Sequence, residues 1–245
     1  ATWKAGGLSV DLVLLLMVLA AVLGLGWGRA QAAQQSIQGT QGELSIGQVG
    51  ARLGPALPWL LGMDAPRTYL VLVQNNHELR ATGGFIAAVG RVTVDKGKPA
   101  ELDFVDSYQL YNPEHTYPTA PLPMRQHMAI DLLLMRDANW SPNFPTTAQM
   151  ARALYAQETG IEVDGIFTVD INAVKLLVSA LGDLQVPGVD EPITGANIEE
   201  QMIRFWEQPA DFEDTISDPA QEDWWSRRKD FVPAIAKAAL ERVQQ

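Results

Sequence analysis

The longest apolar run of the chain lies near its N-terminal end. Residues 8–27 read LSVDLVLLLMVLAAVLGLGW, and no charged residue follows Asp11 within this run. At about 1.5 Å of rise per helical residue, it can cross roughly 30 Å of lipid hydrocarbon. We therefore predict one transmembrane helix over residues 8–28. The alternative is a signal peptide that is cleaved after Ala30-Gln31-Ala32.

The charges on either side of this run set the predicted orientation only weakly. Lys4 precedes the run and Arg29 follows it. We predict a single-pass protein of the cell membrane, with its N-terminus inside and its C-terminal domain outside. Residues 29–62 read as a linker and a short amphipathic segment, and residues 63–245 as one extracytoplasmic domain.

Beyond residue 63, strand-like and helix-like patterns alternate. The continuous apolar run YLVLV at 69–73 is typical of a buried strand, and the turn Asp95-Lys96-Gly97-Lys98 joins two further apolar runs into a hairpin. Four prolines make residues 111–123 irregular. We also predict a strand at 166–169 and helices at 146–159, 171–182, 197–206 and about 230–242. Thr146 opens the helix at 146–159, and Thr194 or Asn197 caps the helix at 197–206. This alternation predicts an α/β domain whose mixed central sheet carries helices on both faces.

Composition excludes several function classes. The 245 residues are 47% hydrophobic, as expected for a packed core, and contain no cysteine, which removes disulfides and thiolate chemistry. The net charge of −11 argues against nucleic-acid binding, which needs a basic face. Only three histidines occur, so a histidine-rich metal site is not expected.

A first candidate site follows the YLVLV strand. Residues 74–85 read QNNHELRATGGF and combine amides, Arg80 and a glycine pair, whose backbone N–H groups can approach an anion. Ligands of open α/β sheets bind at such strand ends. The alternatives are a turn capped by Asn75 and Asn76, and an ion pair between Arg80 and Glu78.

A second candidate is the loop at 134–145, which reads LMRDANWSPNFP. Arg136 can bind phosphate, and Asp137 can hold Mg²⁺ or act as a base. The alternative is an internal pair of these two residues, with Trp140 and Phe144 filling the core.

Two further candidates complete the set. Arg227, Arg228 and Lys229 directly precede a predicted helix N-terminus, where the helix dipole favours an anion, or they neutralise the acidic stretch at 190–223. Asp106 ends a predicted strand, where it can ligate magnesium or start a turn.

Two of these stretches resemble a known family. QNNHELRATGGF and RDANWSPNFPTTAQ resemble the hallmark segments of an uncharacterised bacterial family, a domain of unknown function. The resemblance covers roughly residues 57–240. It implies one N-terminal transmembrane helix and an extracytoplasmic domain.

A second, more distant resemblance concerns the segment VDGIFTVDINAVKLLVSALG at 163–182. It is similar to part of the LytR–CpsA–Psr domains, in which a strand and a helix end in D-A-L-G-G-V. This resemblance implies a membrane-anchored domain that transfers a glycan from a polyprenyl-pyrophosphate carrier to the cell wall. In that family, arginines hold the pyrophosphate and aspartates hold Mg²⁺.

Position by position, this second resemblance is incomplete. Arg80 matches the arginine of an Arg-Ser-Asp motif, but Thr82 replaces its aspartate. Asp106 matches the aspartate of a Pro-Arg-Asp motif, but Val105 replaces its arginine. Arg228 matches a late Arg-Gln pair, with Lys229 replacing the glutamine. One acid and one base are therefore missing, and we expect binding rather than glycan-ligase (phosphotransferase-type) activity.

The sequence thus predicts a membrane-anchored domain that binds a lipid-linked pyrophosphate or phosphoglycan. The anion ligands would be Arg80, Thr82, Arg136, Arg227, Arg228 and Lys229, with Asp106 and Asp137 as the catalytic candidates and Asp106 as the ligand of Mg²⁺, the one cofactor considered. The alternative is a non-catalytic accessory or scaffold subunit of a larger membrane complex.

Overall fold

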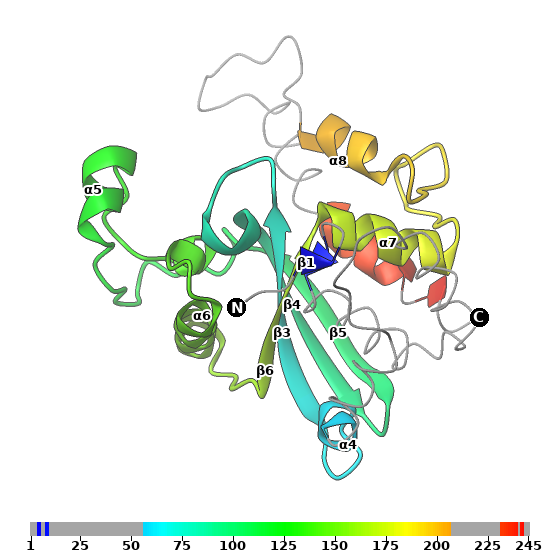
Figure 1. Ribbon diagram of the computed structural model, residues 1–245, viewed down its shortest axis with the longest axis horizontal. Helices are drawn as coiled ribbons and strands as arrows, with labels where there is room; N and C mark the ends of the chain where they lie inside the picture. Colours follow the sequence, from blue (N-terminus) through cyan, green and yellow to red (C-terminus); the bar gives the residue numbers. More distant parts are fainter. Residues whose placement is uncertain (1–3, 6–7, 10–55, 207–230, 240, 243–245) are drawn as a thin grey trace. The chain divides into compact units, whose positions relative to one another are not determined.

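The main sheet has four strands in the order β5-β4-β3-β6. The computed structural model describes residues 4–5, 8–9, 56–206, 231–239 and 241–242 (Figure 1). The strands are β3 (Arg67–Asn75), β4 (Phe85–Asp95), β5 (Lys98–Asp106) and β6 (Gly165–Asp170). β3 and β6 run parallel, with Tyr69 opposite Gly165, whereas a two-residue turn makes β4 and β5 antiparallel. The predicted α/β class and mixed sheet are therefore confirmed.

The β4–β5 turn forms where the sequence predicted it. Lys96 has φ 50° and Gly97 has φ 76°, the pair of positive values that a type I′ hairpin turn needs. β3 is buried from Tyr69 to Asn75, as the uninterrupted apolar run indicated.

The described helices comprise the four predicted ones, in the predicted order, and two short ones that the sequence analysis did not predict. They are α4 (Leu57–Leu60), α5 (Leu122–Met128), α6 (Phe144–Thr159), α7 (Ile171–Leu181), α8 (Ile198–Trp206) and a helix at 231–239. The short 3₁₀ turns are η1 (Ala81–Gly83) and η2 (Met135–Trp140). The predicted start of α6 at Thr146 is wrong, because Asn143 caps the helix by accepting a hydrogen bond from the Thr146 N–H. Residues 122–123 begin α5 rather than staying irregular, because proline is tolerated in a first helical turn.

Both predicted caps of α8 contribute. The Asn197 side chain accepts from the Thr194 N–H at 2.7 Å, and the Thr194 hydroxyl accepts from the Asn197 N–H at 3.2 Å. The helix N-terminus is therefore held by a reciprocal pair.

Near the N-terminus, β1 (Lys4–Ala5) pairs with β2 (Leu8–Ser9). Residues 10–28 of the predicted membrane helix lie outside the described residues. Within the described ranges, no helix combines the length and the apolar content that crossing a bilayer requires.

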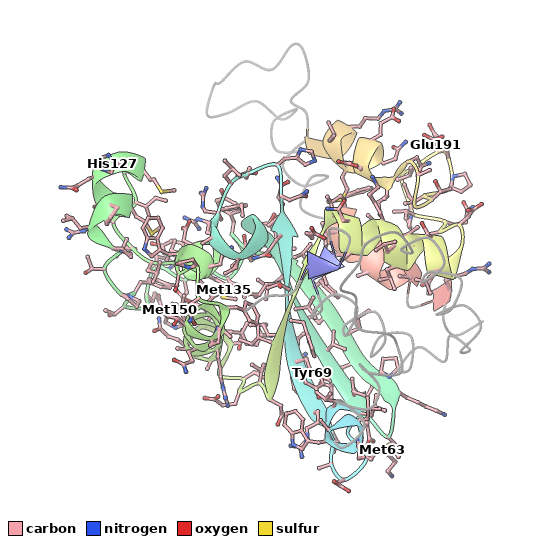
Figure 2. The ribbon with its side chains drawn as sticks, viewed as in Figure 1. Met63, Tyr69, His127, Met135, Met150 and Glu191 are labelled. Atoms are coloured by element: carbon pink, nitrogen blue, oxygen red, sulfur yellow. The ribbon has the colours of Figure 1, made fainter. Side chains whose placement is uncertain are left out.

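The chain forms two compact units. The sheet unit comprises Thr68–Val92 and Phe104–Asp170, and the helical unit comprises the remaining described residues. The sheet unit packs around a core that includes Leu70, Leu72, Ile86, Leu154 and Met135, against which Met150 also packs (Figure 2). The helical unit has its own core, in which the Phe205 and Phe231 rings stack at 4.1 Å.

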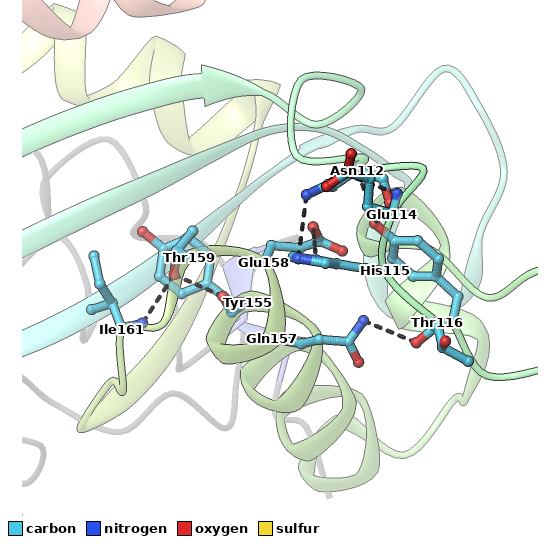
Figure 3. Close-up of polar contacts among 10 residues, drawn as sticks. Asn112, Glu114, His115, Thr116, Tyr155, Gln157, Glu158, Thr159 and Ile161 are labelled. Atoms are coloured by element: carbon cyan, nitrogen blue, oxygen red, sulfur yellow. Dashed lines mark hydrogen bonds and ion pairs between the residues drawn. The ribbon is translucent and has the colours of Figure 1, made fainter.

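Within the sheet unit, α6 holds the proline-rich segment in place (Figure 3). His115 Nδ1 lies 3.1 Å from Glu158 Oε2, and Gln157 Nε2 donates to the Thr116 carbonyl at 3.1 Å. The Tyr117 hydroxyl bonds the backbone of Asn112, and burial, with Glu158 beside it, raises the pKa of Tyr117. The segment has no regular structure through Pro121, but side-chain bonds fix its course.

Candidate functional site

Two arginines from separate loops share one buried carboxylate in the sheet unit. Arg80 Nε lies 3.9 Å from Asp137 Oδ1, and Arg136 Nε lies 3.8 Å from Asp137 Oδ2. The Asp137 side chain is 2% exposed, whereas those of Arg80 and Arg136 are 21% and 25% exposed. The first and second candidate segments therefore meet, and Asp137 neutralises only one of the two guanidinium charges.

Aromatic rings support both guanidinium groups. Arg136 Cζ lies 4.5 Å from the centre of the Tyr108 ring, and Arg80 Cζ lies 5.4 Å from that of Phe85. The two rings are themselves 6.2 Å apart. Stacking on a ring leaves the edges of a guanidinium group available as donors, which suits planar recognition of an oxyanion.

The predicted alternatives for these segments are partly correct. Asp137 does pair internally with Arg136, but Trp140 is 38% exposed and does not fill the core. Glu78 accepts from Asn75 Nδ2 at 3.0 Å, and the carboxylate that faces Arg80 is that of Asp137. Asn75 also caps the turn, because its Oδ1 accepts from the His77 N–H at 3.1 Å.

Thr82 occupies an unusual backbone position. Its φ is 64°, a value that is uncommon for a residue with a branched side chain. Its Oγ1 accepts a hydrogen bond from the buried Gln74 side chain at 3.2 Å. Thr82 therefore links the turn that follows Arg80 to the end of β3. This hydrogen bond explains the position of the Thr82 side chain without a bound ligand.

Asp106 starts a turn, as the alternative interpretation expected. Its Oδ1 accepts from the Tyr108 N–H at 2.8 Å. Among the described residues, no group of three His, Cys, Asp or Glu side chains could hold a metal ion. The carboxylate of Asp137 faces two guanidinium groups, which disfavour an added cation. The predicted role of Asp106 as a magnesium ligand stays a prediction.

Arg227, Arg228 and Lys229 lie outside the described residues. The site as described therefore consists of two arginines, one carboxylate and two supporting rings.

Sequence reasoning missed Asn139. This side chain is fully buried, and its Nδ2 donates to the carbonyls of Ala81 and Gly84 at 2.9 and 2.7 Å. It lies inside the RDANWSPNFP stretch, but nothing in the neighbouring sequence indicates that its side chain forms hydrogen bonds with residues more than 50 positions away.

Burial dominates the titration of Asp137. Desolvation raises the pKa of this carboxyl, and the nearby Arg136 and Arg80 charges lower it by less. A raised pKa in the folded state means that Asp137 contributes stability below its ordinary pKa of 3.8 and that this contribution is lost as pH rises through the folded-state value.

We therefore predict that Asp137→Asn gains stability relative to the parent as pH rises above 3.8. The amide keeps the shape of the side chain and removes the cost of burying its charge. Urea unfolding at a series of pH values on both sides of 3.8 measures the difference. A variant that instead loses stability relative to the parent over this range would show that the two arginines outweigh desolvation.

Comparison with protein-family models places both candidate segments inside one match. The model described as "Protein of unknown function (DUF4012)" covers residues 64–204, more than half of the chain. Arg80, Arg136, Asp137 and Asn139 all fall within this range. A search of curated proteins gives no match to the chain.

Proposed function

The chain belongs to the DUF4012 family of proteins of unknown function, and we propose that its sheet unit binds a lipid-linked pyrophosphate or phosphoglycan through Arg80 and Arg136. One observation carries this proposal: two guanidinium groups from distant segments flank a single buried carboxylate. The pair keeps one positive charge beyond what Asp137 neutralises, and both arginines remain about one-quarter exposed. Arginine pairs of this kind are well suited to phosphate oxygens.

The wider proposal adds the membrane context. A single transmembrane helix over residues 8–28 would hold the domain at the outer surface, and Arg227, Arg228 and Lys229 would add to the anion site. Helices on both faces of the sheet, as predicted from the sequence, would match the LytR–CpsA–Psr arrangement. The resemblance that we noted for residues 163–182 in the sequence is the reason for choosing this ligand. Glycan transfer is left out, because Thr82 and Val105 stand where that resemblance has an aspartate and an arginine.

Pyrophosphate binding by the full chain in detergent tests the proposal. Arg80→Ala and Arg136→Ala are each expected to weaken binding of inorganic pyrophosphate and of polyprenyl-pyrophosphate by about 10- to 100-fold, the range for losing a charged hydrogen-bonding partner. Isothermal titration calorimetry provides the measurement. Inorganic pyrophosphate reports on the head-group site alone, and the lipid form reports whether the carrier adds affinity.

A matched control lies in the same unit. Arg152 pairs with Glu162 on an exposed surface, where its side chain is 52% exposed. Arg152→Ala removes the same charge away from the site and should leave binding unchanged. If Arg80→Ala and Arg136→Ala bind like the Arg152→Ala control, the proposed site is incorrect.

A second function, an accessory or scaffold subunit, is favoured by a different observation. Tyr111, Leu122 and Leu132, on or next to the segment that α6 holds, are each at least 40% exposed. A scaffold role would require such exposed apolar side chains to form a contiguous patch that a partner covers. Sizing after gentle detergent extraction separates the two functions, because a chain that runs alone would count against the scaffold role.

A further inference from the structure

We infer that Asn139 is a positioning residue for the anion site, which holds the turn behind Arg80 against η2 so that Arg80 and Arg136 face the same carboxylate. This inference rests on the proposed function, because it treats Arg80 as a ligand-binding residue. It assigns to Asn139 a role that acts through Arg80 rather than through contact with the ligand.

The geometry of Asn139 joins the two loops directly. Its Nδ2 donates at 2.9 Å to the carbonyl of Ala81, the residue after Arg80, and at 2.7 Å to that of Gly84, the last residue before β4. One amide group is therefore hydrogen-bonded to both ends of the turn. Asp137 lies two residues earlier on the same 3₁₀ turn, so η2 supplies both the carboxylate for the guanidinium groups and the amide for the backbone.

The turn needs this support because its backbone is irregular. Thr82, Gly83 and Gly84 have φ values of 64°, 128° and 142°, so regular helix or strand bonding cannot continue through them. A buried carbonyl without a donor costs free energy comparable to a lost hydrogen bond. The Asn139 amide satisfies two such carbonyls at once, and this fixes the backbone from which the Arg80 side chain extends.

The chemistry of the side chain is specific to an amide. Both hydrogens of Nδ2 point to carbonyl oxygens, and a flipped amide would set its own oxygen against two acceptors. An aspartate at this position would lack the two N–H donors. A leucine would have a similar volume but could form no hydrogen bond. Asparagine therefore suits the position by both its size and its donors.

The test combines Asn139→Asp with the arginine variants in pyrophosphate titrations of the full chain in detergent. Asn139→Asp is expected to weaken inorganic pyrophosphate binding about as much as Arg80→Ala does, that is by roughly 10- to 100-fold. The double variant Asn139→Asp/Arg80→Ala is expected to bind no more weakly than Arg80→Ala alone. In the Arg136→Ala background, the same change at Asn139 should still weaken binding further, because Arg80 is then the remaining cation.

Thr147→Val is the matched control. Thr147 is also fully buried, and its hydroxyl donates to the Ser141 carbonyl at 3.0 Å, away from the Arg80 turn. It should lower stability without changing the pyrophosphate affinity of the folded protein. If Asn139→Asp does not fold, Asn139→Ala, which removes both donors without adding a charge, is expected to weaken binding in the parent and in the Arg136→Ala background but not in the Arg80→Ala background.

The outcomes separate the two ideas. If Arg80→Ala and Arg136→Ala bind normally, the proposed function fails whatever Asn139 does. If they weaken binding but Asn139→Asp binds like the parent, or weakens Arg80→Ala as much as it weakens the parent, Asn139 does not act through Arg80 and the inference is overturned while the proposed function stands.

Discussion

Gly84→Ala is expected to lower the free energy of unfolding by at least about 3 kcal/mol, among the largest effects of any single substitution. Gly84 has φ 142°, and a Cβ built there would lie 2.2 Å from the Asn75 carbonyl oxygen and 2.5 Å from its carbon. Both obstructing atoms belong to the backbone, so no side chain can move aside. Urea unfolding followed by circular dichroism measures the loss.

Gly97→Ala is the control for this prediction. Gly97 also has a positive φ, 76°, but no atom lies within 4 Å of a Cβ added there. Its replacement should cost only about 1 kcal/mol, from backbone strain alone. Equal losses for the two variants would mean that the contact with Asn75 relaxes, and that the turn before β4 is less constrained than its geometry indicates.

Leu72→Ala should have the second large effect, about 2–5 kcal/mol of lost stability. Leu72 is fully buried in β3, between β4 and β6, and belongs to the core of the sheet unit. Truncation removes apolar contacts and leaves a cavity that strands paired on both sides cannot close. Chemical denaturation of the full chain gives the change in stability.

Leu122→Ala makes the same chemical change in a different environment. Leu122 is 54% exposed at the start of α5, so its truncation should change stability by no more than about 0.5 kcal/mol. A Leu72→Ala loss as small as this would contradict the assignment of β3 as the central buried strand.

Local patterns were sufficient for most of the regular elements. The YLVLV run identified β3, and the Lys96-Gly97 turn identified the hairpin. The predicted end of α6 at residue 159 is also confirmed, and the next residue, Gly160, has a φ of 71° that suits glycine. Each of these signals acts within a few residues. The missed helix α5 and the shifted start of α6 have the same origin, because a proline was interpreted as a helix breaker although it is tolerated in a first helical turn.

The site was only partly accessible to this reasoning. Arg80, Arg136 and Asp137 could be singled out because they stand in polar loops at predicted element ends. The sequence analysis placed Arg80 and Arg136 in one anion site, but it could not predict that both would face the Asp137 carboxylate, because this depends on the path of the turn through Thr82. A φ of 64° is unfavourable for the β-branched Thr82. The hydrogen bonds that stabilise this turn come from the buried Gln74 and from Asn139, which is buried and distant along the chain.

The parallel pairing of β3 with β6 has a consequence for a growing chain. β6 ends at Asp170, about a hundred residues after β3 starts, so ribosomal synthesis completes β3, β4 and β5 before the outer partner of β3 exists. During that interval, one side of the YLVLV segment presents unsatisfied N–H and C=O groups beside apolar side chains, the form of strand that invites pairing between nascent chains. The exposed edge of β3 is covered only once residues 165–170 are available to pair with it, on whichever side of the membrane the domain folds.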